Sequence, residues 1–109
     1  EIFKEVSEKI PPNSNVLLVL DSNHTHEHVL AELNLWSPVL QQGNYIIVSD
    51  TVIESIPVQT HRPREWGPGN NPMTGMLEFL ESNTRFTSSN PYTSRSFSSY
   101  NPAGYLKCL

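Results

Sequence analysis

Hydrophobic positions in the first part of the chain follow two patterns in turn. In "EIFKEVSEKI" (1–10), apolar residues recur at the spacing of one helical face, and two prolines follow directly. The next run, "NVLLVL" (15–20), is apolar throughout, which is typical of a parallel strand buried on both faces. The chain therefore opens with a predicted helix and a predicted buried strand.

The same alternation follows once more. From Thr25 to Leu40, apolar residues recur at helical spacing, with Thr25 or Asn23 as the N-cap and Pro38 placed to interrupt the last turns. "GNYIIVSD" (43–50) is then a turn glycine, an apolar strand and a closing aspartate. A second helix and a second strand are thus predicted.

The remainder of the chain predicts a long loop, one helix and two closing strands. Residues 51–70 lack a regular pattern, and a loop of this length in a small domain is usually functional or mobile. Asn71 and Pro72 are a helix start signal for "PMTGMLEFLES" (72–82). We expect its inward-facing residues to be Met73, Met76, Leu77 and Leu80.

The C-terminal region is rich in serine but also contains aromatic residues. In residues 83–101 the interleaved Phe86, Tyr92, Phe97 and Tyr100 favour β-structure over a linker. "RFTSS" (85–89) and "SYNPAGYLKCL" (99–109) are predicted as closing strands, paired antiparallel.

This order of elements predicts an α/β fold with parallel strands and an antiparallel closing hairpin. Ligands of such sheets bind beyond the carboxyl ends of the strands. Asp21 and Asp50 each follow one of the predicted parallel strands. Either aspartate could simply cap the next helix, but two carboxylates on neighbouring strand ends would repel each other unless a divalent cation such as Mg²⁺ lay between them.

Composition narrows the choice of partners and compartment. The chain has 109 residues and a net charge of −4, and its seven Lys and Arg residues form no cluster, so neither nucleic acid nor an anionic membrane is expected as a partner. Cys108 is the single cysteine, and no apolar stretch approaches the roughly 18 residues of a membrane span. We expect a soluble cytoplasmic protein.

Three histidines in "HTHEH" raise the alternative of a zinc hydrolase. Such a site needs three protein ligands, and His24, His26 and His28 could in principle supply them. If residues 26–28 begin a helix, however, the side chains of His24 and His28 share a face and that of His26 points elsewhere. We expect His26 and His28 to face solvent, whereas His24 lies in the turn after Asp21 and could overhang a cleft.

Several blocks of the chain together resemble one enzyme family. "LVLDSNHTHEHVLAELNLWSPVLQQGNYIIVSDT" (18–51), "GPGNNPMTGMLEFLE" (67–81) and "YNPAGYLKCL" (100–109) are similar to the cephalosporin hydroxylase / rhamnosyl O-methyltransferase family. The resemblance implies a Rossmann-like fold, S-adenosylmethionine as cofactor and a divalent-metal site, with Asp21 and Asp50 as ligands and His24 as a catalytic residue. Where the family has an acidic residue before the second aspartate, this chain has Ser49.

The resemblance covers only the C-terminal half of such a methyltransferase. No strand in residues 1–20 is followed by a glycine-rich turn that would hold the cofactor. We therefore expect residues 1–109 to need the missing N-terminal half, a partner chain or a second copy of itself, and to be inactive alone.

The predicted activity is metal-assisted O-methylation of a hydroxyl on a sugar or other small molecule. Trp66 could stack on the acceptor, and Arg62 could meet a carboxylate or phosphate on it. A non-catalytic interaction domain of the same fold is the alternative, favoured by Ser49 and by the missing cofactor half.

Overall fold

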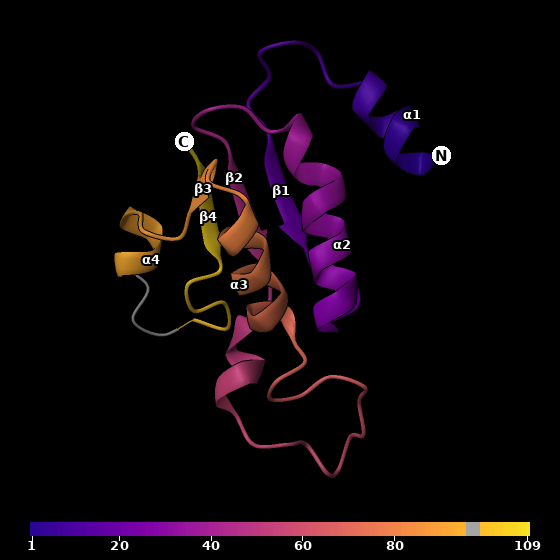
Figure 1. Cartoon of the computed structure of the whole chain (residues 1–109), viewed down its shortest axis with the longest axis vertical. Helices are drawn as coiled ribbons and strands as arrows, with labels where there is room; N and C mark the ends of the chain where they lie inside the picture. Colours follow the sequence, from indigo (N-terminus) through magenta and orange to yellow (C-terminus); the bar gives the residue numbers. More distant parts are fainter. Residues whose placement is uncertain (96–98) are drawn as a thin grey trace.

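Two helices cover one face of a small mixed sheet in this computed structural model (Figure 1), which describes residues 1–95 and 99–109. The elements are α1 (Ile2–Glu8), β1 (Leu17–Leu20), α2 (His26–Trp36), the 3₁₀ helix η1 (Ser37–Val39), β2 (Tyr45–Val48), the 3₁₀ helix η2 (Thr51–Ser55), α3 (Pro72–Ser82), β3 (Phe86–Thr87), α4 (Pro91–Arg95) and β4 (Tyr105–Cys108).

The strand order confirms the predicted α/β class. The strands lie in the order β1-β2-β4-β3, with β1 and β2 parallel and β4 antiparallel to both of its neighbours. In the parallel pair Leu17 is opposite Tyr45 and Leu20 is opposite Val48. The carboxyl ends of β1 and β2 therefore lie at one edge of the sheet, and the loop after η2 extends beyond that edge (Figure 1).

Both long helices start where the sequence indicates. The Thr25 side chain accepts a hydrogen bond from the His28 amide at 3.3 Å, which makes it the N-cap of α2. Asn71 and Thr74 form a reciprocal capping box at the start of α3. Pro38 ends α2 in a 3₁₀ turn, as predicted from its fixed φ and missing amide hydrogen.

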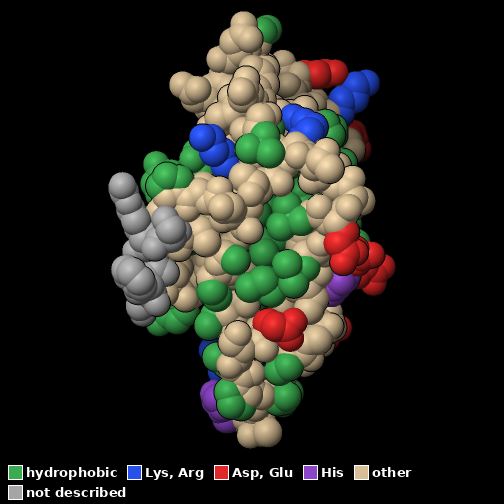
Figure 2. Space-filling model, turned by 60° about the vertical axis from the view of Figure 1, so that its left-hand side comes forward, with side chains coloured by type: hydrophobic (Ala, Val, Ile, Leu, Met, Phe, Trp, Pro, Cys, Tyr) green, Lys and Arg blue, Asp and Glu red, His purple; other side chains and the backbone are tan. Residues whose placement is uncertain are grey.

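The core lies between α2, α3 and the inner face of the sheet. It consists of Leu20, Val29, Leu33, Leu40, Ile46, Val48, Met76, Phe79, Phe86, Leu106 and Cys108. On α3 the prediction was wrong at one position, because Leu77 is 51% exposed, and Phe79 fills the core instead. Hydrophobic side chains also reach the surface over the middle of the face in Figure 2.

The prediction that the first strand is buried on both faces was wrong. Leu20 is buried, whereas Leu17 and Val19 are 61% and 52% exposed. In the described residues α2 and α3 cover one face. The other face, where Tyr92 of α4 packs against Tyr45, carries an open hollow of about 280 Å³ lined by Leu17, Tyr45, Ile47, Tyr92 and Tyr105. A continuous apolar run was the right signal for a strand, but it did not show that one face of β1 stays open.

The serine-rich region is only partly β-structure. Phe86 lies in β3, whereas Tyr92 lies in the short helix α4, and Phe97 lies outside the described residues. The Asn90 side chain accepts hydrogen bonds from the amides of Tyr92 and Thr93, so it caps this helix. Asn90 followed by proline is the same start signal that begins α3, and here it outweighs the aromatic spacing.

The N-terminal helix is attached at the outside of this structure. None of its residues is buried, and its main aromatic contact joins the rings of Phe3 and Trp36, whose centroids are 4.8 Å apart. Trp36 is consequently half-buried under α1 rather than a member of the core. No helix in the described ranges is long and apolar enough to cross a membrane.

Candidate functional site

Side chains in the turn after β1 fix the position of His24. Asn23 accepts a hydrogen bond from the Thr25 amide at 2.9 Å, and Thr25 in turn caps α2. This pair of local bonds joins the strand to the helix in few residues. The turn carries Asp21 and His24 above the end of β1, where Asp21 is largely exposed and the His24 side chain is only 15% exposed.

Asp50 occupies the equivalent place after β2, in an unusual backbone conformation. Its φ of 58° and ψ of 32° are left-handed, a region in which aspartate is tolerated better than most non-glycine residues. Its amide donates a hydrogen bond to the Asn101 side-chain oxygen at 2.8 Å. The Asp50 carboxylate remains partly accessible, with 39% of the side chain exposed.

The two aspartates and His24 meet in one cluster. His24 Nε2 lies 3.0 Å from Asp50 Oδ2 and 3.4 Å from Asp21 Oδ1. The three ligand atoms lie within 4.8 Å of one another, which suits a single cation. His24 Nε2 is buried without a hydrogen-bond partner despite these short distances, because the directions do not suit a hydrogen bond. The cluster thus has an unsatisfied nitrogen facing two carboxylates, the donor set of a divalent cation.

The structure does not bring the three histidines together. The imidazole of His26 pairs with Glu78 on α3, and that of His28 lies 3.2 Å from Glu32 and 3.1 Å from the Ser22 hydroxyl. His28 is solvent-facing as predicted, whereas His26 is partly buried and links α2 to α3. Within the described part of the chain these imidazoles therefore form no shared zinc site.

The long loop borders the cluster through Trp66. The Trp66 ring meets the His24 ring edge to face, with centroids 5.0 Å apart, and the Arg64 guanidinium lies over the Trp66 ring at 5.4 Å. Trp66 also lines a pocket of about 330 Å³, together with Arg62, Arg64 and the mainly apolar residues Ile53, Ile56, Pro57, Val58, Gln59, Thr60, Pro63, Gly67 and Pro68. The pocket and the cluster therefore share one aromatic side chain.

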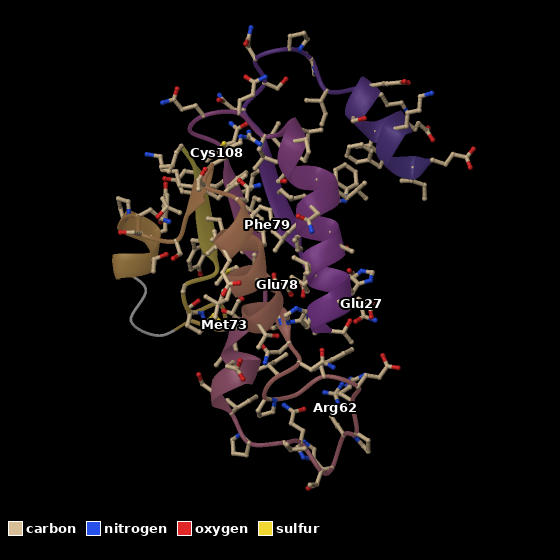
Figure 3. All side chains as sticks on the ribbon, in the orientation of Figure 1. Glu27, Arg62, Met73, Glu78, Phe79 and Cys108 are labelled. Carbon is tan, nitrogen blue, oxygen red and sulfur yellow. The ribbon has the colours of Figure 1, made fainter. Side chains whose placement is uncertain are left out.

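The end of the loop is held close to α2. The Asn70 side chain accepts a hydrogen bond from the His26 amide at 2.8 Å and donates one to the Glu65 carbonyl at 3.1 Å. Gly69 donates its amide hydrogen to a Glu54 carboxylate oxygen at 2.8 Å. Arg62, by contrast, is exposed and lies in the part of the loop that extends away from the sheet (Figure 3). The predicted pair of substrate residues is thus divided between a fixed Trp66 and an exposed Arg62.

Sequence reasoning missed Asn101, whose side chain is bonded to Asp50 across 51 positions. Asn101 belongs to the "YNPAGYLKCL" block that carries the family resemblance, but no residue near it in the sequence indicates that it hydrogen-bonds to Asp50.

The fold and the cluster define an α/β protein with a candidate cation site at the carboxyl ends of two parallel strands. The chain belongs to the rhamnosyl O-methyltransferase/CmcI family, whose model matches residues 1–109. The predicted family is confirmed. A rhamnosyl O-methyltransferase of Mycobacterium tuberculosis and one of Mycobacterium bovis are each 44% identical to it over 43 residues, and one of Mycobacterium leprae is 40% identical over 43 residues.

These similarities extend over limited parts of both chains. The matched segment makes up 39% of this chain, 18% of the M. tuberculosis and M. bovis proteins and 19% of the M. leprae protein. No solved structure matches the chain.

Proposed function

We propose that this chain is the acceptor-binding part of a divalent-metal-assisted, S-adenosylmethionine-dependent O-methyltransferase that acts on a sugar hydroxyl. The observation that carries the proposal is the cluster of Asp21, His24 and Asp50 at the strand ends, in a chain of this family. The rhamnosyl O-methyltransferases that it resembles suggest rhamnose or a related sugar as the acceptor class.

The residues of the cluster fit a divalent cation held by Asp21 and Asp50. Two carboxylates near each other favour a cation between them, and the unsatisfied His24 Nε2 faces the same space. Mg²⁺, which prefers oxygen ligands, is the cation we propose. When bound there, it would make an acceptor hydroxyl easier to deprotonate and would stabilise the oxygen that develops negative charge.

The protein side chains would orient the acceptor and move its proton. His24 is placed to accept the hydroxyl proton at Nε2, because that nitrogen is the atom turned toward both carboxylates. Trp66 would pack against the sugar ring, and Arg62 would meet a polar or anionic group farther out in the pocket. Positioning of this kind supplies much of the rate of a transfer reaction.

We assign no residue of this chain to S-adenosylmethionine. The turns after β1 and β2, "DSNH" and "DTVI", contain no glycine, so neither resembles a phosphate- or nucleoside-binding turn. The open face of the sheet supports the view that the cofactor-binding part belongs to further residues or to a partner chain. Cytoplasmic location and self-association stay predictions.

A test compares Asp21→Asn and Asp50→Asn with wild type in the natural full-length protein. We expect both variants to lose Mg²⁺ binding, measured by calorimetry, and to lose methyl transfer to a rhamnoside. In the wild-type protein, removal of Mg²⁺ by a chelator should abolish the same methyl transfer. Glu27→Gln is the matched control, because Glu27 is an exposed carboxylate on α2 (Figure 3). Unchanged Mg²⁺ binding in both aspartate variants would refute the site.

His24→Gln separates two roles of the imidazole. Retained Mg²⁺ affinity with lost transfer would indicate a proton acceptor, whereas lost affinity would make His24 a third ligand of the cation.

Ser49 favours one alternative, a non-catalytic domain of the same family. The Ser49 amide donates a hydrogen bond to the Leu20 carbonyl at 3.0 Å. Its side chain, however, supplies no carboxylate as a further ligand of the cation. Failure of the full-length protein to bind S-adenosylmethionine would support this alternative.

A further inference from the structure

A turn near the C-terminus is hydrogen-bonded to the end of β2 on both sides of Asp50. The Val48 amide donates to the Gly104 carbonyl at 2.7 Å, and the Val52 amide donates to the Tyr100 carbonyl at 3.2 Å. A Cβ at Gly104 would lie 2.4 Å from the Val48 carbonyl oxygen, so no other residue fits this approach. Backbone hydrogen bonds to this one turn therefore hold the chain both before and after Asp50.

One side chain of that turn reaches the Asp50 backbone directly. Asn101 accepts the Asp50 amide hydrogen at 2.8 Å, and its own backbone is held by the Ser99 hydroxyl at 3.0 Å and by the Gly104 amide at 2.9 Å. Because the donor is an amide N–H, the accepting atom must be the side-chain oxygen of Asn101. The amide of Asp50 thus has its partner in a side chain rather than in the sheet.

This bond matters because the backbone conformation of Asp50 sets the direction of its carboxylate. A left-handed φ of 58° is unfavourable for a residue with a Cβ unless the surrounding structure holds it. Rotation to an ordinary negative φ would swing the Cβ, and with it the carboxylate that lies 3.0 Å from His24 Nε2. The hydrogen bond from the Asp50 amide to Asn101 fixes the peptide plane before the Asp50 Cα, and the bond from the Val52 amide to the Tyr100 carbonyl anchors the backbone after it. Together the two bonds resist that rotation.

We propose that Asn101 is a positioning residue that holds the Asp50 backbone in its left-handed conformation and so aims the Asp50 carboxylate at the cation site. The inference rests on the proposed function, since it assigns a role at the same site. It also gives the "YNPAGY" segment a part in the site, although Asn101 itself touches neither cation nor acceptor in this assignment.

Thr51 offers a matched control, because its side chain also hydrogen-bonds to the turn near the C-terminus. Its buried hydroxyl donates to the Pro102 carbonyl at 2.6 Å, so Thr51→Val removes one hydrogen bond between the same two segments without touching the Asp50 amide. Asn101→Ala removes the bond to the Asp50 amide. Asn101→Asp keeps an oxygen in the accepting position and is the rescue variant. Asn101→Leu, which keeps most of the volume without an acceptor, guards against a folding defect of the alanine variant.

The experiment measures Mn²⁺ binding to the natural full-length protein by electron paramagnetic resonance, with thermal unfolding of each variant recorded beside it. Loss of a group that orients a metal ligand commonly costs about 10–100-fold in affinity, and we expect a loss in that range for Asn101→Ala and Asn101→Leu. Thr51→Val should lower thermal stability to a similar degree with less than about a threefold change in affinity. Asn101→Asp should bind Mn²⁺ at least as tightly as wild type, because its added negative charge also favours the cation.

Asp50→Asn distinguishes a failure of the proposed cation site from a failure of the proposed role of Asn101. If Asp50→Asn binds Mn²⁺ as wild type does, the proposed cation site is wrong, and the role of Asn101 falls with it. If Asp50→Asn loses Mn²⁺ but both truncations of Asn101 keep wild-type affinity, only the positioning role is overturned. Equal losses of affinity in Thr51→Val and Asn101→Ala would also overturn it, because the turn would then act as a whole.

Discussion

Replacing Gly75 by alanine tests how closely α2 and α3 approach each other beneath the candidate site. Gly75 is buried on α3, and a Cβ placed there would lie 2.8 Å from the His26 carbonyl oxygen, 3.3 Å from the Leu30 amide nitrogen and 3.4 Å from the Val29 Cβ. The first of these contacts is with backbone, so it is relieved only if the helices move apart.

Two opposing terms set the expected size of the effect. Overpacking of a well-packed interface typically costs about 1–3 kcal/mol. Alanine in place of glycine inside a helix offsets roughly 1 kcal/mol of this through its better helix propensity. We therefore expect Gly75→Ala to lower the free energy of unfolding by about 1 kcal/mol, which for a domain of this size is a fall in Tm of roughly 4–8 °C.

Equilibrium unfolding in urea, followed by circular dichroism, measures this change. Gly67→Ala is the matched control, because Gly67 has an ordinary φ and a Cβ added there would meet no other part of the structure within 4 Å. That control should be neutral or stabilising by up to about 1 kcal/mol, through a less flexible unfolded chain. A Gly75→Ala protein as stable as the Gly67→Ala protein would refute the close approach of the two helices at His26.

Three further outcomes are expected. Met76→Ala should cost about 2–5 kcal/mol in the free energy of unfolding because Met76 is fully buried, whereas Leu77→Ala, on the exposed side of the same helix, should stay within about 0.5 kcal/mol; equal losses would contradict the observed orientation of α3. Asn71→Ala should lower the free energy of unfolding by about 2 kcal/mol. Asn71 is fully buried, caps α3 through the Thr74 amide and donates a hydrogen bond to the Gly67 carbonyl. A variant that unfolds at the wild-type temperature would exclude a stabilising capping box. Trp66→Ala should raise the KM for the acceptor by up to about tenfold, which corresponds to the free energy of one aromatic contact. Trp36→Ala, the control, should lower stability without changing the KM. An unchanged KM in Trp66→Ala would show that Trp66 does not bind the acceptor.

Helix starts were predictable because their signals are local. Thr25 and Asn71 bond to amides only three positions away, so residue type and spacing are sufficient to find them. The same kind of signal is present at Asn90, but there it competes with the aromatic spacing around Tyr92, which favours β-structure. The fold class was likewise predictable, since alternation of helical and continuous apolar patterns limits the chain to an α/β arrangement.

The candidate site was predictable only in part. Parallel strands bring their carboxyl ends to one edge, so Asp21 and Asp50 could be placed near each other from the order of elements alone. The position of His24 between them, with Nε2 lacking a hydrogen-bond partner, depends on how the turn after β1 brings its side chain to the end of β2. The edge contact between His24 and Trp66 depends in addition on the path of a loop without a periodic pattern.

The sequence by itself determined the two long helices and their N-caps, the two parallel strands, the α/β class and the two carboxylates at the strand ends, because each of these follows from residues close together in the chain or from the order of patterns. Tertiary structure alone decided which face of β1 stays open, that Phe79 rather than Leu77 enters the core, and that Asn101 bonds to Asp50. These features join segments far apart in the sequence, and their geometry is set by the packing of α2 and α3 on one face of the sheet and by the return of β4 beside β2.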